Sequence, residues 1–279
     1  MQTRFLIAPL MLCSALGQAQ SAPAVSQAPP ASTASLHDTL LAKAATLYYS
    51  AAKAGLRNFD CRVHPDWAGM MKSVRKGEPL PESDPRLALL DTVSITLHMN
   101  LKTGSSLEWR LPDPQQKPLD QDQTALLNQV HHGIEQSLGG ILKMWTPLVD
   151  GSIAEMLGEE RAQIFADANG YTLRAKTEHE TVTEIFDNGL VLKRYILESA
   201  TSANVDLAPT FKTDPQGLLP ASFVGRLHGA NTQGPAQEMD VSLEYQSVSG
   251  IEIPARITAV MPNVIEMDFR LDGCAVNQH

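Results

Sequence analysis

The sequence predicts an α+β fold in which a curved antiparallel β half-barrel, an incomplete barrel, is covered by two amphipathic helices. Three observations favour this class. Apolar and polar residues alternate in several segments after residue 161, two Asn-Gly pairs at 169–170 and 188–189 are typical of tight hairpins, and two segments repeat apolar residues every three or four positions. Alternating strands bury one face, and the two amphipathic segments are available to cover it. A long sheet twists and curls, which favours an apolar cavity inside it.

The first amphipathic helix is expected to begin near residue 36 and to end near Gly55. Its apolar residues, Leu40, Ala44 and Leu47, recur every three or four positions. A short strand at 58–64 follows, and a segment at 67–86 rich in proline and charge reads as irregular, with a turn of helix at 67–74.

Two strands then form a predicted hairpin, at 93–101 and 107–111, with Thr103-Gly104 at the turn. The second helix is expected to start near Leu127 and to bury a stripe that reaches Trp145. Gly139-Gly140 should weaken or kink it, and Pro147 should end it.

The N-terminal residues 1–19 have the pattern of a cleaved secretory signal peptide. A short positive start precedes an apolar run that is too short to span a bilayer, and small residues lie at the expected cleavage site near Ala19. Residues 20–35 contain mainly Ala, Pro, Ser and Gln and predict a disordered linker, so the folded domain is expected at 36–279. An alternative is a lipidated N-terminus at Cys13, although Leu12 is larger than such a site prefers.

Two cysteines remain after removal of the signal segment, Cys61 and Cys274. Their even number in an exported chain predicts a disulfide that joins the two ends of the domain and locates the protein in the periplasm or outside the cell. In the chain-entropy model, such a long loop gives a stabilisation of about 5 kcal/mol as an upper estimate. The alternative is two free buried thiols, or a reactive thiol.

The charge pattern excludes several partners. The formal net charge is −9 and the sequence contains no block of Lys and Arg, so binding to a nucleic-acid backbone is not expected. We expect a monomer without cofactors. An envelope membrane protein remains a possible partner.

Two patterns suggest catalytic or metal chemistry. Ser73-x-x-Lys76 with Lys102-Thr103-Gly104 matches two motifs of penicillin-binding enzymes, but the third motif is absent and the spacing is much shorter. His131 and Glu135 share a predicted helix face, but a metal site needs a third ligand. We therefore predict that the protein is not an enzyme and has no metal, and we keep an exported hydrolase as the minor hypothesis.

The C-terminal segment from Tyr245 to Pro254, with its Tyr, Gly and Pro spacing, resembles the LolA/LppX superfamily of periplasmic lipoprotein carriers. The order of helix, strands, helical insert and hairpins is also similar to that family. The resemblance implies a curved half-barrel closed by helices, with a cavity for acyl chains. It transfers no functional residue to this chain.

The leading hypothesis is therefore an exported lipid- or lipoprotein-binding carrier or sensor that holds an acyl chain in an apolar cavity. The alternative is a cell-envelope interaction or structural module with a packed core and no ligand. In the first case, Trp and Met suit an adaptable apolar lining. The candidate ligand-binding residues are Val93, Ile95, Leu97, Met99, Leu107, Trp109 and Trp145.

Overall fold

The computed structural model describes residues 33–277, apart from residues 76, 112–118, 158, 160–161, 200–203, 229–236 and 263. The predicted signal segment at 1–19 lies outside the described residues. So does the predicted linker, except for residues 33–35, which form the start of the first helix.

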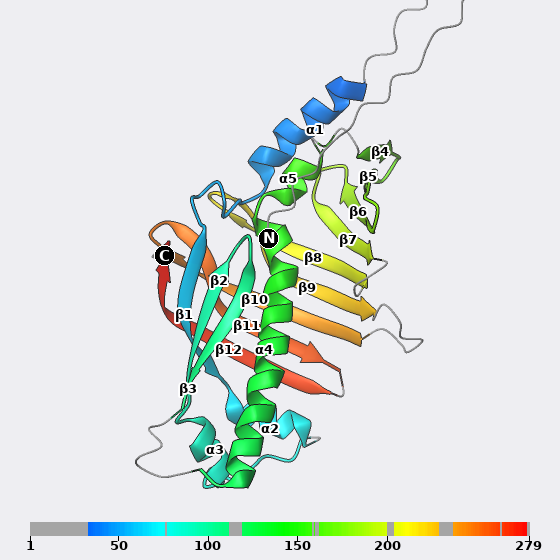
Figure 1. Cartoon of the computed structure of the whole chain (residues 1–279). Helices are drawn as coiled ribbons and strands as arrows, with labels where there is room; N and C mark the ends of the chain where they lie inside the picture. Colours follow the sequence, from blue (N-terminus) through cyan, green and yellow to red (C-terminus); the bar gives the residue numbers. More distant parts are fainter. Residues whose placement is uncertain are drawn as a thin grey trace, which may run out of the picture.

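One antiparallel sheet of twelve strands makes up most of the described chain (Figure 1). The strands in chain order are β1 Asn58–Pro65, β2 Ser94–Asn100, β3 Gly104–Arg110, β4 Gln163–Ala166, β5 Gly170–Lys176, β6 Glu180–Asp187, β7 Leu192–Ser199, β8 Asn204–Asp214, β9 Gly217–His228, β10 Gln237–Val248, β11 Ile251–Met261 and β12 Ile265–Val276.

The spatial order of the sheet is β3-β2-β1-β12-β11-β10-β9-β8-β7-β6-β5-β4. The strands from β4 to β12 follow each other as a meander, and β1 then pairs antiparallel with β12, the last strand. Because β3 and β4 lie at opposite edges, the sheet is open. An open sheet is consistent with the incomplete barrel predicted from the sequence.

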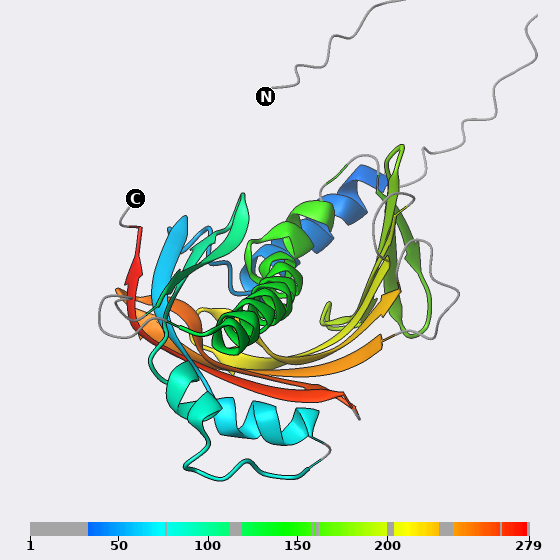
Figure 2. The same cartoon turned by 60° about the horizontal axis from the view of Figure 1, so that its bottom comes forward.

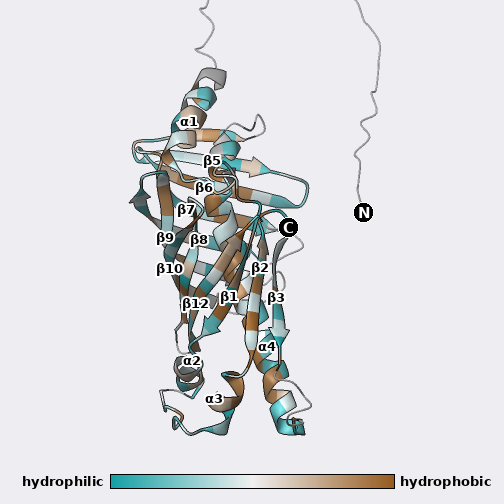
Figure 3. Cartoon of the chain, turned by 90° about the vertical axis from the view of Figure 1, so that its left-hand side faces the viewer, coloured by the Kyte–Doolittle hydropathy of each residue, from teal (hydrophilic) through white to brown (hydrophobic). Residues whose placement is uncertain are grey.

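Burial alternates along the strands as the hydrophobic pattern predicts. On β12, Met267, Phe269 and Leu271 are buried, while Glu266 and Arg270 between them are not. Figure 3 shows hydrophobic and hydrophilic positions alternating along the strands. One face of the sheet therefore supplies most of the core, as in other antiparallel sheets with one solvated side.

Among the residues that the structure describes, five helices accompany the sheet. They are α1 Thr33–Leu47, α2 Trp67–Val74, α3 Pro85–Leu90, α4 Gln121–Val149 and α5 Ser152–Leu157. Figure 2 shows the sheet curving around α4, which runs along its concave side, while α2 lies near β12. The first helix packs on α5 and on β9 at the other end of the molecule. Within the described residues, no helix is long and apolar enough to cross a membrane.

Helix α4 differs from the sequence expectation at both ends. It begins at Gln121, where Asp120 forms a capping box with Gln123, and it continues to Val149 with Pro147 inside it. Pro147 was expected to end the helix, and that expectation was wrong. A proline in the last turn removes only one helical hydrogen bond, and burial of the following residues, Leu148 and Val149, holds that turn in place.

The predicted first helix also ends earlier than expected, at Leu47 instead of near Gly55. Tyr48 then forms a bridge with Leu218, and its hydroxyl donates to Leu190 O and accepts from Leu192 N. These long-range hydrogen bonds replace the next helical turn.

The predicted disulfide between Cys61 and Cys274 is present and spans 213 positions. It links β1 to β12, the two strands through which the N-terminal hairpin joins the meander. The bond therefore cross-links the strand pair that joins β1, β2 and β3 to the meander of β4 to β12.

Candidate functional site

The seven residues predicted to line a cavity lie in or against the core. Four of them, Ile95, Leu97, Met99 and Trp145, are at most 2% exposed. The other three, Val93, Leu107 and Trp109, are half-buried and pack against the same core. None of the seven lines the apolar cleft described below.

An open cleft of about 250 Å³ lies between α2, the N-terminal half of α4 and the start of β12. We call it the α2–α4 cleft. Its lining residues are Trp67, Met70, Met71, Leu126, Gln129, Val130, Gly133, Ile134, Ser137, Ile265 and Met267. None of these side chains is ionisable, and only Gln129, Ser137 and the indole N–H of Trp67 supply polar groups. The cleft is suited to exclude water from an apolar group.

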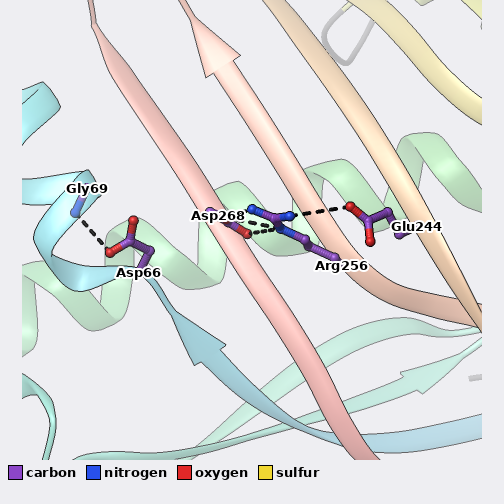
Figure 4. Close-up of polar contacts among 5 residues, drawn as sticks. All are labelled: Asp66, Gly69, Glu244, Arg256 and Asp268. Carbon is purple, nitrogen blue, oxygen red and sulfur yellow. Dashed lines mark hydrogen bonds and ion pairs between the residues drawn. The ribbon is translucent and has the colours of Figure 1, made fainter.

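The α2 wall is set by a cap at the start of this short helix. Asp66 accepts a hydrogen bond from Gly69 N at 3.0 Å, and its own backbone N–H donates to Asp268 O of β12 at 2.9 Å. Figure 4 shows the Asp66 carboxylate turned toward Gly69. A Cβ at position 69 would overlap with the Asp66 carboxylate, so glycine permits this close approach.

A second contact fixes the other end of α2. Ser73 Oγ accepts from the backbone N–H of Glu266 at 3.1 Å and donates to Met70 O at 2.7 Å. The two ends of α2 are thus tied to β12, and Trp67, Met70 and Met71 are presented to α4 across the cleft.

The α4 wall is a stripe of residues spaced by three or four positions, from Leu126 to Ser137. In its middle lies Gly133, where an added Cβ would meet no atom within 4 Å. The missing side chain at Gly133 therefore helps keep the cleft open.

The β12 wall is formed by Ile265 and Met267. The residue before them, Val264, is 62% exposed in the turn that joins β11 to β12.

Two further aromatic rings, those of Trp109 and His131, lie next to the cleft residue Trp67 or next to each other. The Trp67 and Trp109 ring centroids are 6.5 Å apart, and the Trp109 ring lies 4.6 Å from that of His131. The Trp109 indole N–H is buried and has no hydrogen-bond partner among the described residues. Trp109, predicted from the sequence as a ligand contact, is therefore placed next to a lining residue.

The outer face of the sheet has the opposite character. In Figure 4, Arg256 of β11 lies between Asp268 of β12, at 2.6 Å, and Glu244 of β10, at 3.4 Å. Similar pairs join Arg226 to Glu238 and Arg194 to Asp206. Exposed pairs of this kind add little stability each, but they keep this face hydrated and separate it from the apolar interior.

The two motifs that suggested catalysis or metal binding are not assembled. The Lys102-Thr103-Gly104 turn lies where β2 meets the start of β1, whereas Ser73 follows the other end of β1. Lys76 is outside the described residues. The His131 ring lies tilted against that of Trp109, and in the described part of the chain no three His, Cys, Asp or Glu side chains are grouped to hold a metal.

Sequence reasoning missed most of the cleft. The periodic pattern places Val130 and Ile134 on the apolar face of the second helix and Met267 on the buried face of the last strand, but Met70 and Met71 were not named. The available signal was the Met70-Met71 pair three residues after Trp67, within the turn of helix expected at 67–74.

Comparison of the chain with protein-family models, with curated proteins and with solved structures gave no significant match.

Proposed function

We propose that this protein binds an acyl chain, of a lipid or of a lipidated protein, in the α2–α4 cleft and acts as an exported carrier or sensor. The observation that carries the proposal is a cleft of about 250 Å³ whose lining contains no ionisable side chain. Ligand pockets are typically concave and mostly apolar, with a few polar groups. Here Gln129, Ser137 and the indole N–H of Trp67 would be those groups.

Burial of methylene groups would supply the affinity. Each buried methylene contributes about 0.8 kcal/mol, so about ten methylenes are needed to exceed an association cost of about 4 kcal/mol and leave measurable binding. The thioethers of Met70, Met71 and Met267 suit a flexible chain, because methionine adapts to irregular apolar shapes.

Four further features support the proposal. An open antiparallel sheet that curves around α4 is the architecture expected of a half-barrel carrier, and the resemblance of Tyr245–Pro254 to the LolA/LppX superfamily agrees with it. The Cys61–Cys274 disulfide supports an oxidising compartment, as does the proposed signal segment at 1–19.

The test uses cis-parinaric acid, a fatty acid that fluoresces when it enters an apolar site. Gly133→Leu should fill the cleft and weaken binding at least about tenfold, because a side chain at 133 projects into open space. Leucine also favours the helix over glycine, so the variant should remain folded.

Gly140→Leu is the matched control. Gly140 lies on the same helix, also has no atom within 4 Å of an added Cβ, and does not line the cleft. This variant should bind as the wild type does. Equal binding by Gly133→Leu and wild type would exclude the α2–α4 cleft as the site.

The second candidate is a cell-envelope module with a packed core and no ligand. The near-zero exposure of Leu97 and Trp145 favours it, because the core beside α4 is filled. Absence of cis-parinaric acid binding by the wild-type protein would support this candidate against the first.

A further inference from the structure

Three methionine side chains line the α2–α4 cleft. Met70 and Met71 come from α2, and Met267 comes from β12. Met71 is half-buried, whereas Met70 is 9% exposed and Met267 is 1% exposed. The cleft therefore contains one partly exposed methionine and two that are buried.

We infer that Met71 is an oxidation site through which a peroxide lowers the affinity of the α2–α4 cleft for an acyl chain. The inference rests on the proposed function. It adds a means of releasing the ligand that the apolar lining alone does not provide.

The chemistry is a two-electron oxygen transfer. The Met71 sulfur attacks one oxygen of hydrogen peroxide, the O–O bond breaks, an S–O bond forms, and the remaining oxygen leaves as water with both hydrogens. Sulfur is oxidised to the sulfoxide and the peroxide is reduced. This converts a flexible apolar side chain into a polar one.

The surroundings of Met71 make that change costly for an apolar ligand. Among the lining residues, the side chains of Gln129, Ser137 and Trp67 carry hydrogen-bond donors. The new sulfoxide oxygen would mostly be hydrated by water, which an acyl chain would have to displace. We expect oxidation to weaken binding about tenfold or more.

The coupling must act in both directions. If the sulfoxide disfavours the ligand, then the ligand disfavours formation of the sulfoxide, and a bound chain also covers the sulfur. Met156 of α5 is half-buried too but does not line the cleft, so it provides an internal reference in the same molecule.

The experiment treats the full chain with hydrogen peroxide, with and without cis-parinaric acid, and follows each methionine by peptide mass spectrometry. Met71 should oxidise before Met70 and Met267, and the fatty acid should slow oxidation of Met71 but not of Met156. The protein with oxidised Met71 should then bind cis-parinaric acid at least about tenfold more weakly.

Two variants sharpen the result. Met71→Leu keeps an apolar side chain of similar volume, so it should bind before oxidation and retain its affinity under doses that oxidise Met71 in the wild type. Met156→Leu should lose affinity on oxidation just as the wild type does.

Unchanged affinity after complete oxidation of Met71, or equal oxidation rates with and without the fatty acid, would overturn this inference and leave the proposed function standing. A wild-type protein that fails to bind cis-parinaric acid before oxidation would overturn both.

Discussion

The two halves of α4 belong to one continuous helix but have different surroundings. In the C-terminal half, Leu138, Ile141, Leu142, Trp145, Leu148 and Val149 are at most 1% exposed. In the N-terminal half, Leu127 and Ile134 are buried, and the stripe beside them borders the α2–α4 cleft. The C-terminal half packs in the core, and the N-terminal half faces an open space.

The difference lies in what each half meets. Trp145 fills the space between α4 and the sheet, with its indole N–H donating to Tyr245 at 3.0 Å and its ring edge-to-face with Phe59 at 6.3 Å. The N-terminal half instead faces α2, a helix of eight residues. The surface that it presents to α2 contains Gly133, which has no side chain to fill the space. Helix formation is equal in the two halves, so side-chain size and the opposing element decide which half is open.

The largest change in the free energy of unfolding is expected from a substitution in the C-terminal half of α4. Trp145→Ala should lower the free energy of unfolding by about 3–5 kcal/mol, because it leaves a large cavity and removes the indole donor to Tyr245. Urea unfolding measures the loss. Val130→Ala in the cleft wall should cost about 1 kcal/mol or less, since that side chain is only half-buried. Equal losses would mean that the two halves are packed alike.

The C-terminal half of α4, and much of the sheet and disulfide around it, could be predicted from the sequence. The apolar stripe that ends at Trp145, the alternation along β2, β10, β11 and β12, and the pairing of Cys61 with Cys274 all follow from local periodicity or from cysteine number. The helix stripe and the strands depend on repeated patterns in which each repeat adds evidence for the same arrangement, whereas the disulfide depends on the even number of cysteines.

The cleft could not be predicted in the same way. Its α2 wall is placed by hydrogen bonds between Ser73 and Glu266, which are 193 positions apart, and no local pattern reports such a contact. The segment 67–86, which contains α2, reads as irregular because of its prolines and charges. Periodicity likewise could not show that Pro147 would stay inside α4, since burial of Leu148 and Val149 decides it.

The next largest effect on stability depends on pH and comes from a carboxyl group near the C-terminal end of α4. Glu184 of β6 is 1% exposed, and its Oε2 has no hydrogen-bond partner among the described residues. Burial, with a smaller contribution from the charge of Asp150 at the end of α4, raises the pKa of Glu184 to about 8. The folded protein therefore retains a proton that the unfolded chain releases above its ordinary pKa of 4.5.

The sign of the pH dependence follows from this difference. The folded state binds more protons between pH 4.5 and 8, so the contribution of Glu184 to stability is complete below 4.5 and is lost as pH rises toward 8. From pH 5 to pH 7 the loss should be roughly 3 kcal/mol. Glu184→Gln should abolish this slope in urea unfolding at a series of pH values.

Glu180→Gln is the control, because Glu180 lies on the same strand but is exposed. It should leave the slope intact. A slope that survives in Glu184→Gln would assign the pH dependence to another group.

The smallest effect is expected at α2, the helix that forms the wall of the cleft opposite the N-terminal half of α4. Asp66→Ala removes the cap of α2 and should lower stability by about 1 kcal/mol. Loosening of α2 should also weaken cis-parinaric acid binding, because Met70 and Met71 are carried on this helix. Trp145→Ala, by contrast, removes a residue outside the cleft lining.

Gly69→Ala makes this prediction sharper, because its effect should depend on residue 66. In the wild-type background the new Cβ displaces the Asp66 carboxylate, so loss of the cap offsets the helix preference of alanine. In the Asp66→Ala background nothing opposes that preference, and Gly69→Ala should stabilise the protein by up to about 1 kcal/mol. A double-mutant cycle by urea unfolding measures the coupling. Additive effects would show that the Asp66–Gly69 contact does not position α2, and the open half of α4 would then need another explanation.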